Sequence, residues 1–316
     1  KEMYIVYDLF YESISIYQEK DMVDISQLNT EARNEKTMNL DEMSTVELLT
    51  VMNEEDTNPA KAVKLAIGQI AEAVELTKAS LRKNARMIYI GAGTSGRMGL
   101  MDAVECVPTF SSENVIGLIA GGEGAFIKAV EGAEDSKELA VEDLKKINLT
   151  KDDTVIGIAA SGRTPYVIGG LDYAHSIGAS TVSVACNNGA EISKHADVAI
   201  EVNAGPEILT GSTRLKSGTC QKLICNMLST ATMVGIGKVY KNLMVDMKPT
   251  NLKLKERARR ITMMATGCER EVAEKALTDS HNNMKVAIVM ILENITKEEA
   301  EARLEKADGY VRKALD

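Results

Sequence analysis

Short apolar runs alternate with amphipathic segments through the middle of the chain. The apolar runs have the length of buried strands and lie near residues 86–90, 115–119, 154–158, 181–185 and 197–201. Segments with a helical pattern alternate with them, near residues 97–105, 125–130, 134–147, 165–177 and 212–237. Strands separated by helices favour a parallel sheet with helices on both faces. We therefore predict an α/β fold built on a doubly wound, parallel, five-stranded sheet.

The chain before this core is polar and is predicted to form helices at the surface. Residues 28–58 are expected to wrap the core and to include a short helix over 44–53. Asn58 and Pro59 suit the N-cap and the first position of a helix. The apolar spacing over 60–83 then predicts one long amphipathic helix.

Residues 1–21 are rich in tyrosine, although the rest of the chain is poor in aromatic residues. Three of the tyrosines are spaced as on one face of an amphipathic helix. Acidic residues interrupt any apolar core in this segment, which argues against a signal peptide. We expect residues 1–21 to be dispensable for chemistry and Met22 to be the native start.

The pattern changes again after residue 249, where strand-like runs end. Thr296 and Glu299 have the spacing of a capping box. Gly267 and Gly309 are expected to separate short helices, so this end of the chain should form a small helical bundle. The expected division is an N-terminal extension over 1–27, a sheet domain with N-terminal helices over 28–249, and a helical domain over 250–316.

The sequence Gly-Ala-Gly-Thr-Ser-Gly-Arg at 91–97 follows the first predicted strand directly. Gly91 and Gly93 allow a tight turn, and Thr94 and Ser95 stand where a helix should begin. Backbone N–H groups and the positive end of the helix dipole then point at one spot, which favours an anion. The two hydroxyls add donors that suit phosphate oxygens.

A second strand–turn–helix unit repeats these features. Ser-Gly-Arg recurs at 161–163 after the predicted strand at 154–158, and Thr164 and Pro165 begin the next helix. Turns at the carboxyl ends of neighbouring parallel strands face one crevice. The two turns therefore predict a phosphosugar-type site, whose phosphate contacts would be Gly93, Thr94, Ser95, Ser161, Gly162 and Thr164.

A dinucleotide site is the alternative for the first turn, because Gly91, Gly93 and Gly96 also satisfy Gly-x-Gly-x-x-Gly. That site needs an acidic residue at the end of a second strand, about 20 residues further on. Here the strand at 115–119 is followed by Ala-Gly-Gly. Hydroxyls inside the turn also suit a phosphate monoester better than a pyrophosphate.

Composition narrows the classes of partner. The formal net charge of -9 argues against a general nucleic-acid binder. No apolar run reaches the length of a membrane span. An acidic protein that binds an anion must concentrate positive charge locally, and Arg97, Arg163, Arg214 and Lys216 are candidates for this.

The five cysteines form no Cys-x-x-Cys pair and have no histidine partners at zinc spacing. An odd count without a framework suits a reducing cytoplasm. Cys106 lies beside Glu105 and could be a nucleophile, but a small buried apolar residue is the favoured interpretation.

Five stretches of the chain together resemble the N-acetylmuramic acid 6-phosphate etherases, which are built on the sugar-isomerase (SIS) fold. The similarity extends from about residue 29 to the C-terminus and is carried by residues 91–97, 102–109, 129–136, 158–166 and 205–216. The last stretch is shared with the glucokinase regulatory proteins, so it marks the wider family. The resemblance implies a cytoplasmic etherase with a C-terminal helical (UBA-like) module, no metal or organic cofactor, and a phosphosugar substrate.

The resemblance also implies particular residues. Glu105 and Glu134 match the family's two catalytic glutamates, and Glu131, three residues before Glu134, is the alternative to it. Without the resemblance, Glu134 would be interpreted as a helix cap and Glu105 as part of a solvated helix face. Val104 and Val107 stand where we expect Ser and Pro in the family. Weaker candidates for the pocket wall are Glu207, Ser212, Thr213 and Lys216.

The sequence also bears on the oligomeric state of the protein and on two alternative functions. Since SIS sites are commonly completed by a neighbouring subunit, we expect a homodimer, with the apolar segment 223–234 at its interface. One rival function is a non-catalytic phosphosugar sensor, but the related regulatory proteins carry two SIS units and this chain has room for one. The other is a phosphosugar isomerase, which usually needs a histidine, and the three histidines, His175, His195 and His281, lie outside the motifs.

Overall fold

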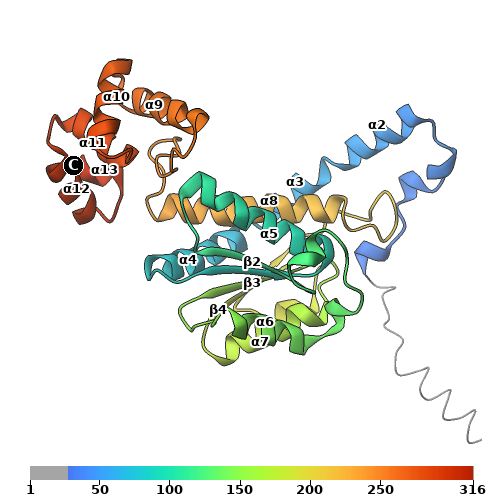
Figure 1. Ribbon diagram of the computed structural model, residues 1–316. Coiled ribbons are helices and arrows are strands. Elements are labelled where there is room, and N and C mark those ends of the chain that lie inside the picture. The colour runs from blue at the N-terminus through green and yellow to red at the C-terminus, as the bar shows by residue number, and fades with distance from the viewer. Residues whose placement is uncertain (1–27, 316) are drawn as a thin grey trace, which may run out of the picture.

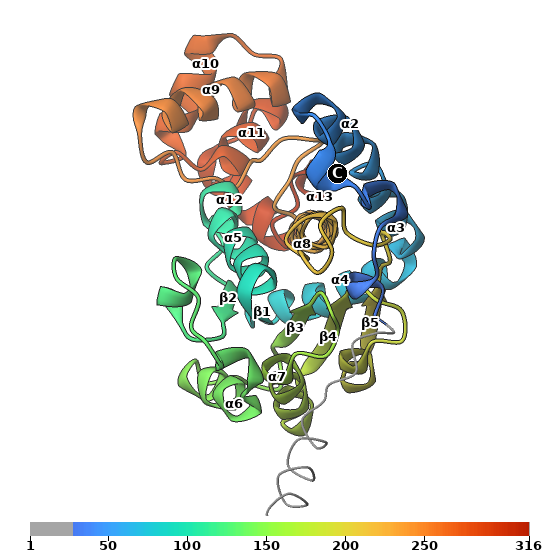
Figure 2. The ribbon, with the colours of Figure 1, turned by 90° about the vertical axis from the view of Figure 1, so that its right-hand side faces the viewer.

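The computed structural model describes residues 28–315, so the predictions for residues 1–21 and Met22 lie outside the described residues. At its centre lies a sheet of five parallel strands in the order β2-β1-β3-β4-β5, which Figure 2 shows from left to right. The α/β fold is therefore as predicted. The strands are β1 (Met87–Gly91), β2 (Val115–Ile119), β3 (Thr154–Ala159), β4 (Ser180–Ala185) and β5 (Val198–Glu201).

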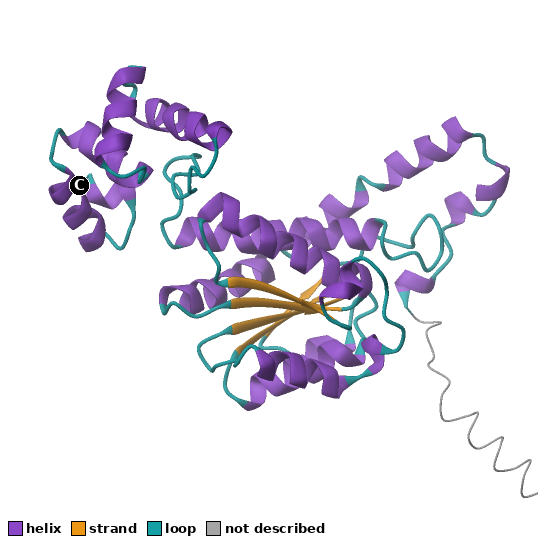
Figure 3. Cartoon of the chain, viewed as in Figure 1, coloured by secondary structure: helices purple, strands orange, loops and turns teal. Residues whose placement is uncertain are grey.

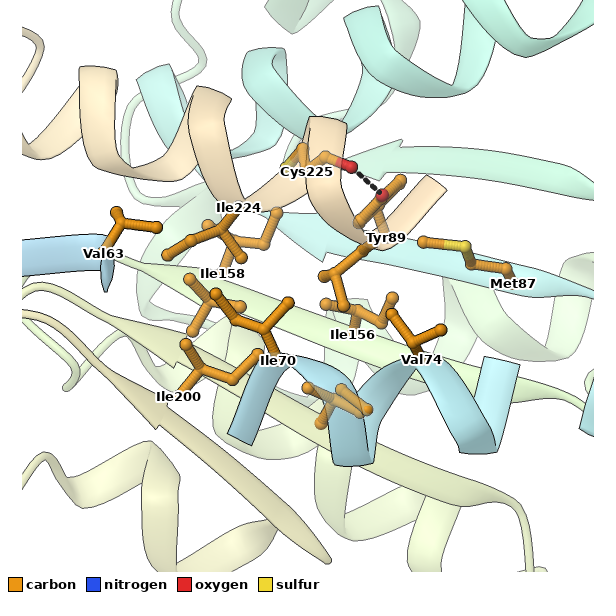
Figure 4. Close-up of a cluster of buried hydrophobic side chains, with 14 of the residues drawn as sticks. Val63, Ile70, Val74, Met87, Tyr89, Ile156, Ile158, Ile200, Ile224 and Cys225 are labelled. Carbon is orange, nitrogen blue, oxygen red and sulfur yellow. Dashed lines mark hydrogen bonds between the residues drawn. The ribbon is translucent and has the colours of Figure 1, made fainter. Parts of the chain in front are cut away.

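Helices cover both faces of the sheet (Figures 1 and 3). One face carries α4 (Ile67–Arg82), α5 (Gly93–Phe110) and α8 (Lys216–Gly235), and the other carries α6 (Lys137–Lys146) and α7 (Pro165–Ser176). Successive strand residues point to opposite faces, so Met87 and Tyr89 of β1 pack in the first layer (Figure 4) and Ile88 and Ile90 in the second. The uninterrupted apolar strands fit this two-sided burial.

Helix α5 is longer at both ends than the predicted 97–105. The helix can begin at Gly93 because Gly91 and Gly96 have no side chains, and the first turn of α5 can therefore pack directly against the end of β1. A Cβ on Gly96 would stand 2.6 Å from the carbonyl oxygen of Gly91. The helix continues through Pro108 to Phe110, and its C-cap, Ser111, has a left-handed φ of 51°.

The predicted helix over 60–83 is wrong as a single element. The structure has α3 (Asn58–Leu65) followed by α4, because the amide of Ala66 bonds to the carbonyl of Val63, three residues back. That tighter turn redirects the chain. Asn58 is already helical and is not the N-cap, which is Thr57.

Two further helix predictions need correction near the site. Over 125–130 the structure has only the 3₁₀ turn η4 (Glu123–Phe126). Helix α6 starts at Lys137 because the side chain of Ser136 accepts the amide of Leu139 and caps it. Glu134 therefore lies in the preceding 3₁₀ turn, η5 (Ala133–Asp135), and does not begin the helix.

The segment from residue 28 to the end of α2 (Thr45–Glu55) forms an arm that leaves the body of the molecule (Figure 1). Its helix α2 begins at a capping box between Ser44 and Glu47. Val46 and Leu49 on this helix are 75% and 57% exposed. Short 3₁₀ turns precede it: η1 (Asn29–Glu31), η2 (Glu35–Thr37) and η3 (Leu40–Glu42).

The C-terminal helices form a bundle with its own hydrophobic core, as predicted. Gly267 ends the first helix with a φ of 76°, and the capping box at Thr296 is present. Tyr240 and Met247, which precede residue 250, pack in the same core. Between residues 28 and 315, no helix is both long and apolar enough to cross a membrane. The helices are α9 (Leu252–Thr266), α10 (Arg270–Asp279), α11 (Met284–Glu293), α12 (Lys297–Lys306) and α13 (Val311–Ala314).

Candidate active site

The two hydroxyl turns lie side by side at the carboxyl ends of β1 and β3. These strands are neighbours, and Gly91 pairs with Ile158 in their register. From β1 the chain crosses to β2 on one side, and from β2 it returns to β3 on the other. This is the topological switch point of the sheet, where open α/β folds bind ligands.

The first turn presents an open helix N-terminus. Gly93 has a left-handed φ of 51°, and Ala92 at the N-cap provides no side-chain cap. The first helical amide with a partner is that of Gly96, which bonds to the Ala92 carbonyl at 3.1 Å. The amides of residues 93–95 thus remain available to an anion. Ser95 is buried, and its Oγ accepts a 2.9 Å hydrogen bond from Nε2 of Gln221.

The second turn is held by a residue that sequence reasoning missed. The side-chain amide of Asn187 donates to the carbonyls of Ala160 at 3.1 Å and Ser161 at 3.4 Å. Its Oδ1 accepts the amide of Asn29 at 2.8 Å, so it also anchors the arm. The sequence offered one signal for this role, because Asn187 is a polar residue two positions after the apolar run of β4. Gly162 takes a left-handed φ of 74° in this turn.

Two of the four candidates in the segment 205–216 are held by protein partners. The buried carboxylate of Glu207 caps α8 by accepting the amides of Lys216 and Ser217, each at 2.9 Å. The Lys216 ammonium is buried against Glu55 at 2.6 Å.

The other two, Ser212 and Thr213, are half-buried. The carbonyl of Thr213 accepts the amide of Gly218 at 2.9 Å. A Cβ on Gly218 would lie 3.5 Å from Cγ2 of Thr94 and 3.6 Å from the Thr213 carbonyl oxygen. The structure thus brings Thr213 near the first hydroxyl turn.

A cavity of about 210 Å³ opens beside the first turn. Gly93, Arg97, Glu131 and Glu134 are among the residues that line it. The Arg97 guanidinium donates to the carbonyls of Ala125 and Phe126, at 2.8 Å each, and so fixes the cavity wall. Both glutamates are exposed, so either carboxylate can act on a ligand in this cavity.

Glu105 lies elsewhere on the molecule. It is exposed on α5 and is not among the residues that line this cavity. It lies eleven positions after Thr94, which is about 16 Å along the helix. Its neighbours Val104 and Val107 are 59% and 45% exposed. Within one chain, a hexose phosphate held at the start of α5 is too short to reach Glu105.

Cys106 is buried, as the favoured interpretation predicted. Burial raises the pKa of its thiol to about 12, so it is not a nucleophile at neutral pH. Asp102, one turn earlier on α5, accepts from the Tyr89 hydroxyl at 3.0 Å and the Ser229 hydroxyl at 3.1 Å. Burial raises the pKa of this carboxyl too. Asp102 therefore ties α5 to β1 and α8 beneath the site.

Comparison with known families agrees with this architecture. The glucokinase regulatory protein N-terminal SIS domain matches residues 69–175, and the SIS domain matches residues 136–231. A solved structure of a phosphoheptose isomerase from Neisseria gonorrhoeae is 16% identical, with an alignment over 60% of this chain and 99% of that chain and a TM-score of 0.46. The sheet and the two domain matches define an SIS-domain protein.

Relatives that match most of the chain identify the family within the SIS-domain proteins. An N-acetylmuramic acid 6-phosphate etherase of Exiguobacterium sp. strain AT1b is 60% identical over 92% of this chain and 100% of its own length. The etherase 2 of Lactiplantibacillus plantarum is 60% identical over 93% and 100%. That of Mycolicibacterium smegmatis is 56% identical over 93% and 99%. The chain belongs to the N-acetylmuramic acid 6-phosphate etherase family.

Proposed function

We infer that this chain is an etherase that cleaves the D-lactyl ether of N-acetylmuramic acid 6-phosphate. The products are N-acetylglucosamine 6-phosphate and D-lactate, and the reaction belongs to the recycling of cell-wall sugars. The observation that carries this inference is 60% identity over 92% of the chain to a relative of that name. The two hydroxyl turns at the switch point support it. The free cysteines support a cytoplasmic location.

Elimination followed by hydration is the proposed mechanism. In the open-chain sugar the C1 aldehyde acidifies the proton on C2. A base removes that proton, the C2–H electrons form a C2=C3 double bond, and the C3–O bond breaks. An acid protonates the departing lactyl oxygen. Water then adds its hydroxyl to C3 and a proton to C2. Two carboxylates can perform these proton transfers.

Glu134 is assigned as the C2 base and Glu105 as the acid for the lactyl oxygen. The position of Glu134 in the wall of the cavity beside Gly93 supports its role. Glu131 lines the same cavity and is the alternative base. The position of the bound sugar relative to each carboxylate sets their roles. Phosphate contacts are assigned to the two hydroxyl turns.

The position of Glu105 supports a homodimer with shared sites. Since a sugar bound at the first turn cannot reach Glu105 of the same chain, the acid would come from a second subunit. Glu105 stands between two exposed valines on α5, and Met227 and Val234 on the adjacent α8 are 38% and 49% exposed. This apolar surface, which includes part of the predicted segment 223–234, suits an interface.

The decisive assay adds N-acetylmuramic acid 6-phosphate and measures D-lactate. In deuterated water the sugar product should carry deuterium at C2, and in oxygen-18 water the label should enter the sugar at C3. Label in the lactate would mean cleavage on the lactyl side and would refute elimination. Hexose-phosphate binding without lactate would favour the sensor, and ketose formation the isomerase.

Mixing two inactive variants tests the shared site. Glu105→Gln and Glu134→Gln should each lose turnover far more than substrate binding. When the two are unfolded together and refolded, mixed dimers should regain activity, because one of their two sites combines an intact Glu134 with the partner's intact Glu105. If both residues acted from one chain, every mixed dimer would stay inactive.

Phosphate binding is tested separately. Ser95→Ala and Ser161→Ala should each raise KM, because losing a hydrogen bond to a charged group costs roughly 1.5–3 kcal/mol, or about tenfold to over a hundredfold. Normal kinetics in both variants would place the phosphate elsewhere.

A further inference from the structure

Gln221 is a fully buried amide on α8 with one atom left without a partner. Its Nε2 donates to Ser95 Oγ at 2.9 Å. Its Oε1 is buried and accepts no hydrogen bond from any residue between 28 and 315. Buried polar groups are almost always matched, so an exception calls for an explanation.

The orientation of this amide decides what Ser95 can do. With Nε2 facing Ser95, Oε1 is left unmatched in the core between α5 and α8. In the opposite orientation Oε1 would accept the Ser95 hydroxyl, whose proton would then point into the core. An apolar side chain of similar size would leave no polar atom unmatched here, so stability does not account for glutamine.

The effect on Ser95 does account for it. A hydroxyl carries one proton and two lone pairs. When Ser95 accepts from Gln221, its own proton is free to be donated at the open N-terminus of α5. When it donates inward, it presents lone pairs to the incoming anion, and these repel phosphate oxygens.

We propose that Gln221 is a positioning residue, whose amide keeps the Ser95 hydroxyl in the orientation that donates to the substrate's phosphate. This inference rests on the proposed phosphate site at the first hydroxyl turn. Gln221 acts only through Ser95. Gln221 therefore leaves its Oε1 unmatched in the core, and its Nε2 orients the Ser95 hydroxyl at the site.

Two variants of Gln221 separate this role from a packing role. Gln221→Met keeps the volume and removes both the donor and the unmatched oxygen. KM should rise about three- to tenfold with little change in kcat, and Tm should be unchanged or higher. Gln221→Glu is isosteric but, when ionised, only accepts. It draws in the Ser95 proton and adds a negative charge, so KM should rise further and inorganic phosphate should inhibit more weakly.

Ser183→Ala is the matched control. Ser183 is also buried with an unmatched hydroxyl, but it lies within β4, away from the turns. Its removal should leave KM unchanged. A lower Tm with unchanged KM in Gln221→Met would overturn the proposal, because that is the result of a purely structural role.

The double variant Ser95→Ala/Gln221→Met tests whether Gln221 acts through Ser95. If Gln221 acts through Ser95, adding Gln221→Met to Ser95→Ala should raise KM no further. Increases that multiply would overturn the proposal. A normal KM in Ser95→Ala alone would remove the phosphate contact and the inference together, whereas a raised KM there with normal Gln221 variants would overturn only the inference.

Discussion

The buried ion pair between Lys216 and Glu55 joins the arm to α8, and its two ends should respond differently to mutation. In Glu55→Gln the Lys216 ammonium, which is 1% exposed, loses its only carboxylate among the described residues. An uncompensated buried charge costs about 3–5 kcal/mol, which corresponds to a fall in Tm of roughly 6–20 °C for a domain of this size. In Lys216→Met, Glu55 keeps an ion pair at 2.9 Å with Lys36, whose side chain is 65% exposed. The loss should therefore be smaller.

Lowering the pH should reduce the difference in Tm between the wild type and Glu55→Gln. Burial acts to raise the pKa of Glu55, but hydrogen bonds from Lys216 and Lys36 outweigh it and lower the pKa from 4.5 to about 2. A lowered carboxyl pKa stabilises the fold above the unfolded value, and this stabilisation is lost as pH falls through the folded value. In thermal melts the gap in Tm should thus be full at pH 7 and shrink between about pH 4.5 and pH 2.

The double variant Glu55→Gln/Lys216→Met should recover most of the loss, because it leaves no buried charge without a partner. The reasoning would be refuted if Lys216→Met destabilised as much as Glu55→Gln, or if the Tm gap stayed constant on acidification. Far-UV circular dichroism on all variants at each pH checks that a folded state is being compared.

Three further predictions concern single positions. Asn187→Ala should release the carbonyls of the second turn and raise KM more than it lowers kcat; an effect on Tm alone would mean that Asn187 only anchors the arm. Gly96→Ala should lower Tm strongly, because its Cβ would meet backbone at 2.6 Å, whereas Gly68→Ala in helix α4, with open space around it, should stabilise by up to about 1 kcal/mol. Asp102→Asn should gain stability relative to the wild type as pH rises, because burial raises the pKa of Asp102 and its ionised form destabilises the folded state. Chemical denaturation at pH 5 and pH 8 measures the difference in unfolding free energy, and a difference that shrinks at pH 8 would contradict the prediction.

Local pattern alone determined the sheet and the place of its two turns. Short runs of branched apolar residues that alternate with helical segments favour strands buried between helical layers, and all five strands were predicted within a residue or two. Glycine, hydroxyl and proline positions after β1 and β3 have local conformational causes, and parallel pairing then brings both turns to one edge. These features depend on neighbours in sequence, which is why they could be predicted.

The tertiary structure decided everything that depends on distant partners. Lys216 and Glu207 look like ligand contacts in sequence, yet Glu55 and the α8 amides occupy them. Asn187 and Gln221 carry no motif, because their importance comes from packing against turns that lie far away in sequence. Spacing along a chain does not encode such contacts, since they are set by how helices pack on the sheet.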